Sequence, residues 1–481
     1  MRVLALGLAV VALVAPQPIA SAGRPMSSIV DGAAAAFMAK YHVPGLAVAV
    51  VRHGVIVYER GYGYADRDAK IPATADTRFE IGSITKQITA ACILQQVRAG
   101  RLSLDDRLGT FVPDYPAAAA VTVRELLGQS SGIPEYAFFG AKEQPNTVAE
   151  IVQRVAAKPL EFRPGSRFAY SNTNYALLGR VLESVSHESY ADYVRAHIFG
   201  PARMTHSSFI WDERTIPDMA AGYVRAGGGV APAQPVLHLI ADAAGADGAI
   251  VSTAGDVARW DIALASGAIV PAPDVAMMRT PVQLSGDAWS NYAMGWVQDT
   301  LGGHPRVSHS GGTDGFAATN AVFPGDDEAI VAVDNEALST PARLAAAVFS
   351  AEHPDVTARF RTPVRGEDKT VTARLRELLR RLARGQPDPA QFAARARVLI
   401  TPDGIAFLRD ALEPLGPITA MIYRGRTSLP AHGTTPAMTV YTYHVEYGMD
   451  RDRVVIGLDA GNKVTAFGVL AFNDDVPPGR R

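Results

Sequence analysis

Residues 79–86 read Phe-Glu-Ile-Gly-Ser-Ile-Thr-Lys and place Ser83 and Lys86 three residues apart at the start of a predicted helix. The apolar spacing predicts that this helix runs from Ser83 to Ala99 and ends at Gly100. Positions i and i+3 share one helical face, so the lysine amine can lie beside the hydroxyl. A serine hydroxyl becomes nucleophilic when a nearby base accepts its proton. The pair therefore predicts a nucleophilic serine, and the alternative is a helix-capping serine beside a solvated lysine.

Two further motifs strengthen this prediction. Tyr170-Ser171-Asn172 lies in a predicted loop that opens another helix. The Tyr170 phenol can relay protons, and Asn172 can orient the lysine and a substrate amide. His309-Ser310-Gly311-Gly312 ends a predicted strand, where the glycines admit a substrate backbone and the Gly312 amide can donate to an oxyanion. Three such motifs in this order indicate catalysis more strongly than any one of them alone.

The distribution of strand and helix signals predicts an α/β (α+β) fold. Strand signals lie at both ends of the first 350 residues, and Ala-rich helical segments fill the middle from Ser83 to about Gly267. We expect an antiparallel sheet flanked by helices with a large helical insertion, and an active site between the two parts. The predicted strands are 46–52, 55–62, 292–298, 306–309, 317–323 and 329–333, with helices at 28–41 and 341–349.

The two ends of the chain predict further segments. Residues 1–22 combine Arg2, an apolar run and Ala20-Ser21-Ala22, which is typical of a cleaved signal peptide and of export to the periplasm or medium. Residues 23–352 would form the hydrolase domain and 353–368, with two prolines and several charges, a linker. Residues 369–481 would form a small α+β domain. Its predicted helices are 371–382 and 402–412, and its strands 418–424, 438–447, 453–459 and 464–472.

The three motifs resemble those of the serine β-lactamase and penicillin-binding-protein superfamily, specifically its class C-like branch, which includes D,D-carboxypeptidases, D-aminopeptidases and carboxylesterases. The resemblance runs from about Ser28 to Phe349, with supporting stretches at 100–106, 252–256 and 292–296. The tail loosely resembles cystatin-like or nuclear-transport-factor-2-like domains.

The resemblance implies a role for each motif residue. Ser83 would be the acylated nucleophile, Lys86 its base partner, and Tyr170 the general base or proton relay. Substrate would contact Asn172, His309, Ser310 and Gly311, and the amides of Ser83 and Gly312 would form the oxyanion hole. No cofactor is implied, and the expected partner is a small-molecule or peptide substrate.

His309 departs from the class C pattern, which has a lysine at this position. Histidine has a reference pKa of about 6.5 and is mostly neutral at pH 7, so it holds a substrate carboxylate less well than lysine. This favours an esterase or a D-amino-acid peptidase or amidase. The alternatives are a true class C-like β-lactamase and a catalytically inactive envelope-binding protein.

Several other readings are disfavoured. Gly128-Gln129-Ser130-Ser131-Gly132 matches a nucleophile elbow, but that motif follows a strand and 123–127 reads as helix. The lone cysteine, Cys92, reads as a core residue. No His-Glu-x-x-His motif or i, i+4 histidine pair suggests a metal site. A net charge of −2 gives no reason to expect nucleic acid, and no later apolar run predicts a membrane span.

Overall fold

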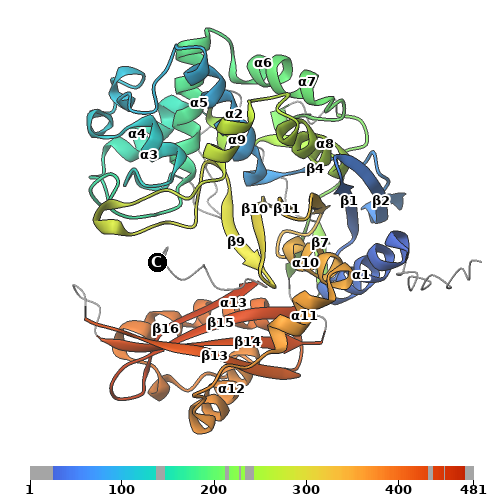
Figure 1. The fold of residues 1–481 in the computed structure, drawn as a ribbon, viewed down its shortest axis with the longest axis vertical. Coiled ribbons are helices and arrows are strands. Elements are labelled where there is room, and N and C mark those ends of the chain that lie inside the picture. The colour runs from blue at the N-terminus through green and yellow to red at the C-terminus, as the bar shows by residue number, and fades with distance from the viewer. Residues whose placement is uncertain are drawn as a thin grey trace, which may run out of the picture.

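The computed structural model describes residues 25–136, 147–211, 216–226, 229–232, 243–431, 437–448 and 450–471, and Figure 1 shows the arrangement of its elements. The predicted signal peptide lies outside these residues. Within the described ranges, no helix is long and apolar enough to cross a membrane.

The central element is a seven-stranded antiparallel sheet in the order β3-β2-β1-β12-β11-β10-β9. Pairing of β1 with β12 brings the N-terminal hairpin beside strands almost 300 residues later. The strands are β1 (Gly45–Arg52), β2 (Val55–Asp66), β3 (Ile71–Pro72), β9 (Val297–Leu301), β10 (His304–Gly312), β11 (Ala317–Phe323) and β12 (Glu328–Asp334). The predicted mixed fold with an antiparallel sheet flanked by helices is confirmed.

Side chains of β1 alternate between two apolar cores, as the two-residue period of a strand requires. Ala47, Ala49 and Val51 face the core shared with the helical middle. Leu46, Val48 and Val50 face the core beneath α1 (Met26–Tyr41) and α10 (Pro341–Glu352). The sheet is therefore covered on both faces (Figure 1).

The segment between β3 and β9, called the helical middle, contains the Ser83 motif and most of the α-helices. Its helices are α2 (Thr85–Arg98), α3 (Val123–Leu127), α4 (Val148–Ala156), α5 (Asn172–Ser186), α6 (Tyr190–Val194), α7 (Gly200–Ala202), α8 (Ala254–Ala265) and α9 (Ala272–Met278). Its short strands are β4 (Phe79–Glu80), β5 (Ser208–Phe209), β6 (Tyr223–Ala226), β7 (Gly229–Pro232) and β8 (Ile250–Ser252).

Several predicted boundaries differ from the structure, and two of them bear on the region around Ser83. The helix expected from Ser83 begins as a 3-10 turn at Gly82–Ile84 and becomes α-helical only at Thr85. The strand expected at 292–298 begins at Val297, because Gly295 turns the chain at a φ of 78° with its backbone against Gln87.

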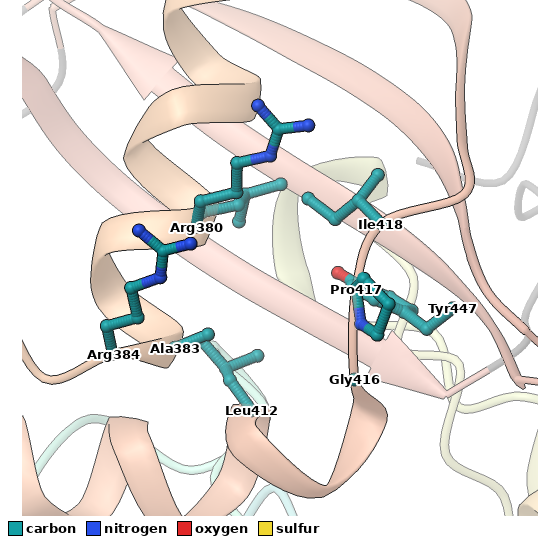
Figure 2. Close-up of a pocket in the computed structure, with 9 residues that line it drawn as sticks. Arg380, Ala383, Arg384, Leu412, Gly416, Pro417, Ile418 and Tyr447 are labelled. Carbon is teal, nitrogen blue, oxygen red and sulfur yellow. The ribbon is translucent and has the colours of Figure 1, made fainter.

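The tail is a four-stranded antiparallel sheet, β13-β14-β15-β16, packed against α12 (Lys369–Ala383) and α13 (Pro402–Leu412). Its strands are β13 (Ala420–Leu429), β14 (Met438–Tyr447), β15 (Asp450–Leu458) and β16 (Val464–Ala471). Asp368 caps α12, and the buried leucines at 375, 378, 379 and 382 form an apolar stripe along it. A pocket of about 280 Å³ lies between α12 and the segment before β13, with Arg380 and Arg384 on its α12 side (Figure 2).

The tail is docked against the outer layer of the main sheet. The first half of the predicted linker forms helix α11 (Pro354–Arg361), because Val356 and Phe360 lie one helical turn apart and both are buried. Arg343 of α10 forms a bidentate ion pair with Asp452 of β15. One apolar core joins the outer layer to the tail, so the division into two domains near residue 353 stays a prediction.

Candidate active site

The turn that carries Ser83 lies against the end of β10. Gly82 has a φ of 49°, and a Cβ there would come within 2.7 Å of the Gly312 nitrogen. A Cβ on Gly311 would come within 1.9 Å of the Ile81 carbonyl oxygen. Both positions therefore require glycine, and this close contact sets the backbone of Ser83 beside that of Gly312.

Lys86 is fully buried on the first turn of α2. Its Nζ lies 2.9 Å from Ser83 Oγ, 2.8 Å from Asn172 Oδ1 and 2.6 Å from the Asp247 carbonyl oxygen. An ammonium has three donors, and these three oxygens match them in number. The lysine is thereby fixed with one hydrogen bond directed at the serine.

Tyr170 is the second residue whose side chain contacts Ser83. Its hydroxyl lies 2.8 Å from Ser83 Oγ, and its ring centroid lies 5.0 Å from Lys86 Nζ. The residue is 38% exposed, so its hydroxyl connects the buried lysine with the solvent side of the site. Asn172 follows as the first residue of α5, and its backbone N–H donates to the Glu135 carboxylate. The structure thus brings Ser83, Lys86, Tyr170 and Asn172 together.

His309 lies on β10 and is buried. Its Nδ1 is 2.7 Å from the Ser310 carbonyl oxygen and its Nε2 is 3.2 Å from the Tyr292 hydroxyl. A carbonyl can only accept, so Nδ1 carries the proton and Nε2 accepts from Tyr292. Burial, followed by the charge of Lys86, lowers the pKa of His309 to about 4. The imidazole is therefore neutral at pH 7, as the sequence argument assumes.

The remaining motif residues lie on the same strand. Ser310 and Gly311 pair with Thr319 and Ala318 of β11. Ser310 is exposed and Gly311 is buried against the Ser83 turn. The strand therefore presents Ser310 outward beside the site while Gly311 keeps the contact with residues 81–83 tight.

Sequence reasoning missed a buried support beneath Lys86. The Asp247 carboxylate accepts a hydrogen bond of 2.7 Å from the Tyr136 hydroxyl, while its backbone carbonyl holds Lys86. Burial raises the pKa of Asp247 to about 6, and the nearby lysine opposes that rise. Neither residue stands in a recognisable motif, and both come close to Lys86 only through the tertiary fold.

The disfavoured nucleophiles lie in structural positions. Ser130 is buried and follows α3, so no strand precedes it as an elbow would require. Its neighbour Gln129 accepts hydrogen bonds from the Ser171 amide and from Asn174, which supports the loop that carries Tyr170. Cys92 is fully buried in α2, and burial raises the pKa of its thiol.

Known proteins are similar to this chain in sequence. Protein flp of Staphylococcus aureus (strain MRSA252) is 32% identical over 207 residues, which are 42% of this chain and 42% of that protein. The chain thus spans less than half the length of that relative. Penicillin-binding protein 4* of Bacillus subtilis (strain 168) is 29% identical over 339 residues, or 66% of this chain and 74% of that protein.

Solved structures are similar over longer stretches. D-amino acid amidase from Ochrobactrum anthropi SV3 has a TM-score of 0.62 at 25% identity, covering 68% of this chain and 99% of that one. The octameric penicillin-binding protein homologue from Pyrococcus abyssi has a TM-score of 0.62 at 23% identity and covers 92% of this chain and 99% of that one. The similarity to the Pyrococcus abyssi protein shows a shared fold only. It covers 92% of this chain and therefore includes part of the tail.

The family comparison agrees with the geometry and the relatives. Residues 30–355 match the family model described as Beta-lactamase, which is more than half of the chain. The chain belongs to the beta-lactamase family.

Proposed function

We propose that the protein is a serine hydrolase that forms an acyl-enzyme on Ser83 and cleaves an ester or a D-amino-acid amide or peptide bond. The observation that carries the proposal is the approach of two proton-handling groups to one hydroxyl, with Lys86 Nζ at 2.9 Å and Tyr170 OH at 2.8 Å from Ser83 Oγ. Both distances lie within the reach required for proton transfer.

In the proposed acylation, Ser83 Oγ attacks the substrate carbonyl carbon and loses its proton to whichever of its two partners is in the basic form, a neutral Lys86 amine or a Tyr170 phenolate. The developing oxyanion is held by the amides of Ser83 and Gly312, which the glycine contact sets side by side. The proton then passes to the leaving group, and Tyr170 suits this step because it reaches from Ser83 toward solvent. Water attacks the ester of Ser83 in the second step, and the serine regains its proton.

The substrate class rests on two observations. His309 is neutral, and both its ring nitrogens are already hydrogen-bonded to Ser310 and Tyr292, so it offers a substrate carboxylate no positive charge. D-amino acid amidase, similar at 25% identity over 68% of this chain, is named for D-amino acid amides, which have no carboxylate. Together they support esters and D-amino-acid amides above β-lactams, which carry a carboxylate.

Labelling with a fluorophosphonate tests the nucleophile. One adduct per chain is expected, on the peptide that contains Ser83, and Ser83→Ala should lose both labelling and ester turnover. The matched control is Ser130→Ala, since Ser130 is a buried serine outside the group around Lys86. Labelling of the Ser130 peptide, or an unreactive wild type that nevertheless binds substrate analogues, would contradict the proposal.

Substitution of His309 tests the substrate class. The wild type should hydrolyse short-chain p-nitrophenyl esters and act slowly on chromogenic cephalosporins. His309→Lys should raise the cephalosporin-to-ester ratio of kcat/KM roughly fivefold, because a charge-assisted hydrogen bond to the carboxylate exceeds a neutral one by about 1 kcal/mol. The control is His309→Gln, which is uncharged like the native imidazole and should leave the ratio nearly unchanged.

The pH dependence of the same ratio provides a second check. The pKa of His309 is about 4, so its charge does not change between pH 5.5 and pH 8. His309 should therefore cause no change in the wild-type cephalosporin-to-ester ratio between pH 5.5 and pH 8. Cephalosporin hydrolysis by the wild type at about 10⁵ M⁻¹s⁻¹ or faster, a usual rate for a true substrate, would refute the argument.

A further inference from the structure

Three potential metal ligands converge at the end of β10 opposite to Gly312. His304 begins β10, Asp326 lies in the turn between β11 and β12, and His353 lies between α10 and α11. One ligand atom from each residue lies within 4.8 Å of those from the other two. All three side chains are partly buried, with exposures of 20%, 18% and 24%.

A shared apolar neighbour orients the two imidazoles. Phe349 of α10 is fully buried, and its ring contacts the rings of His304 and His353 at centroid distances of 5.2 and 4.0 Å. The two imidazoles lie 5.1 Å apart, centroid to centroid. Packing against one rigid ring limits the rotamers of both histidines, so the ligand atoms are held close together before any ion binds.

Carboxylates occupy both sides of His304. Its Nδ1 lies 2.9 Å from Asp326 Oδ1 and 3.0 Å from Oδ2, and its Nε2 lies 2.9 Å from Asp355 Oδ2. Histidines that bind metals usually donate their second ring N–H to a carboxylate, which fixes the tautomer. With Asp355 as that acceptor, Nδ1 is the nitrogen left for an ion shared with Asp326.

His353 has the same kind of support. Its Nε2 lies 3.4 Å from Glu328 Oε2, and Glu328 is a buried residue. The second oxygen of that carboxylate, Oε1, is buried without a hydrogen-bond partner among the described residues. Arg52 contacts Glu328 and Glu352 and offsets part of the negative charge. Carboxylates still outnumber this guanidinium around the two imidazoles.

We propose that His304, His353 and Asp326 form a binding site for a divalent transition-metal ion, with Zn²⁺ as the best-suited candidate. Two imidazoles and one carboxylate are a donor set that Zn²⁺ accepts, and water completes the tetrahedron. Asp355 and Glu328 are positioning residues that orient the two histidines. No local motif marks the site, because its ligands are 22 and 27 residues apart in the sequence.

The position of the site indicates a structural role. Its ligands join the β9–β10 hairpin, the β11–β12 turn and the α10–α11 junction, which is the place where the chain leaves the main sheet for the tail. The ion would act as a cross-link that stabilises this junction. The proposal is independent of the proposed hydrolase activity, because Ser83 contacts the other end of β10.

Zinc binding to the full chain, purified without a polyhistidine tag and stripped with chelator, tests the proposal. Equilibrium dialysis should find one Zn²⁺ per chain, and a hundredfold excess of zinc over Kd should raise Tm by a few degrees. Co²⁺ in place of zinc should give the visible absorption of a tetrahedral site. His304→Ala and Asp326→Asn should each weaken zinc binding at least tenfold while Ser83 stays reactive to a fluorophosphonate.

The residue after Asp326 provides a matched control, because Asp327 also pairs with a histidine. His53 and Asp327 form an exposed pair, with Nδ1 3.1 Å from Oδ2, and have no second histidine in the group of ligands. His53→Ala should bind zinc as the wild type does. The conservative Asp326→Asn separates lost ligation from misfolding, because it keeps the shape of the side chain. Equal zinc affinity in Asp326→Asn, His304→Ala and wild type, or a zinc effect lost equally in His53→Ala, would overturn the proposal.

Discussion

The double variant Lys86→Met/Tyr170→Phe is expected to be little slower than the poorer of its two single variants. Each single substitution should lower kcat by about 10²-fold or more, the size of a general-base contribution. Lys86 and Tyr170 both contact Ser83 Oγ, and the lysine lies 5.0 Å from the phenol ring, so they form one proton path. When two groups act as a unit, removing either one already abolishes their joint contribution to kcat. Removing the second then lowers kcat little further.

Methionine is the preferred replacement for Lys86 because the side chain is fully buried and alanine would leave a cavity. Asn172 Oδ1 and the Asp247 carbonyl lose a donor in either case, so thermal unfolding must be recorded beside kcat. Stopped-flow acylation by an activated ester supplies the rates. Fully multiplicative losses in folded variants would show that Lys86 and Tyr170 act separately.

Removal of Arg343 is expected to cost about 3–5 kcal/mol of folding free energy, the usual effect of leaving a buried charge without its partner. Asp452 is fully buried, and its bidentate pair with Arg343 joins α10 to β15. Arg343→Ala leaves the carboxylate in the apolar layer that the tail shares with α1 and α10. Urea denaturation of both proteins measures the difference.

The loss of stability in Arg343→Ala should be smaller at acidic pH. Burial raises the pKa of Asp452 and Arg343 opposes that rise, so the variant has a still higher folded-state pKa. A group with a raised folded-state pKa favours the folded state at low pH and loses that contribution as pH rises through the raised value. The difference in unfolding free energy between wild type and variant should therefore be smaller at pH 5 than at pH 8.

Arg361→Ala is the control for this experiment. Arg361 also joins the junction to the tail through Glu446, but its side chain is 59% exposed. Glu446 is buried, but Arg451 Nε also lies 3.5 Å from its carboxylate, so the loss of Arg361 leaves this charge with a partner and the variant should unfold closer to wild type than Arg343→Ala. If Arg343→Ala and Arg361→Ala are equally stable, the tail is not held by the buried pair.

Local patterns account for the parts of the fold that the sequence predicted. The alternation in β1 and the Ser83–Lys86 spacing are short-range features, and the structure places a strand and a helical turn there. The strand predicted from residue 292 and helix α11 differ from the prediction. The turn at Gly295 delays the strand to Val297, and tertiary burial of Val356 and Phe360 gives helical order to a segment rich in proline and charge.

The candidate site divides in the same way. Motifs predicted Ser83, Lys86, Tyr170, Asn172 and His309, and the structure brings them together. Asp247 and the cluster at His304 depend on contacts between distant segments, with Asp247 161 residues from Lys86. A single sequence does not encode such contacts as a pattern, since no spacing rule relates the partners.

The contact between Gly82 and Gly311 has a consequence for protein engineering. The spacing between the two proposed oxyanion amides depends on the absence of side-chain atoms, because a Cβ on either glycine would collide with backbone of the opposite segment. Libraries that aim at new substrates can vary Ser310, which points outward from β10, with little risk to this spacing. Gly82 and Gly311 tolerate no substitution of this kind. The least and the most substitutable positions of the site therefore lie next to each other on β10, at Gly311 and Ser310.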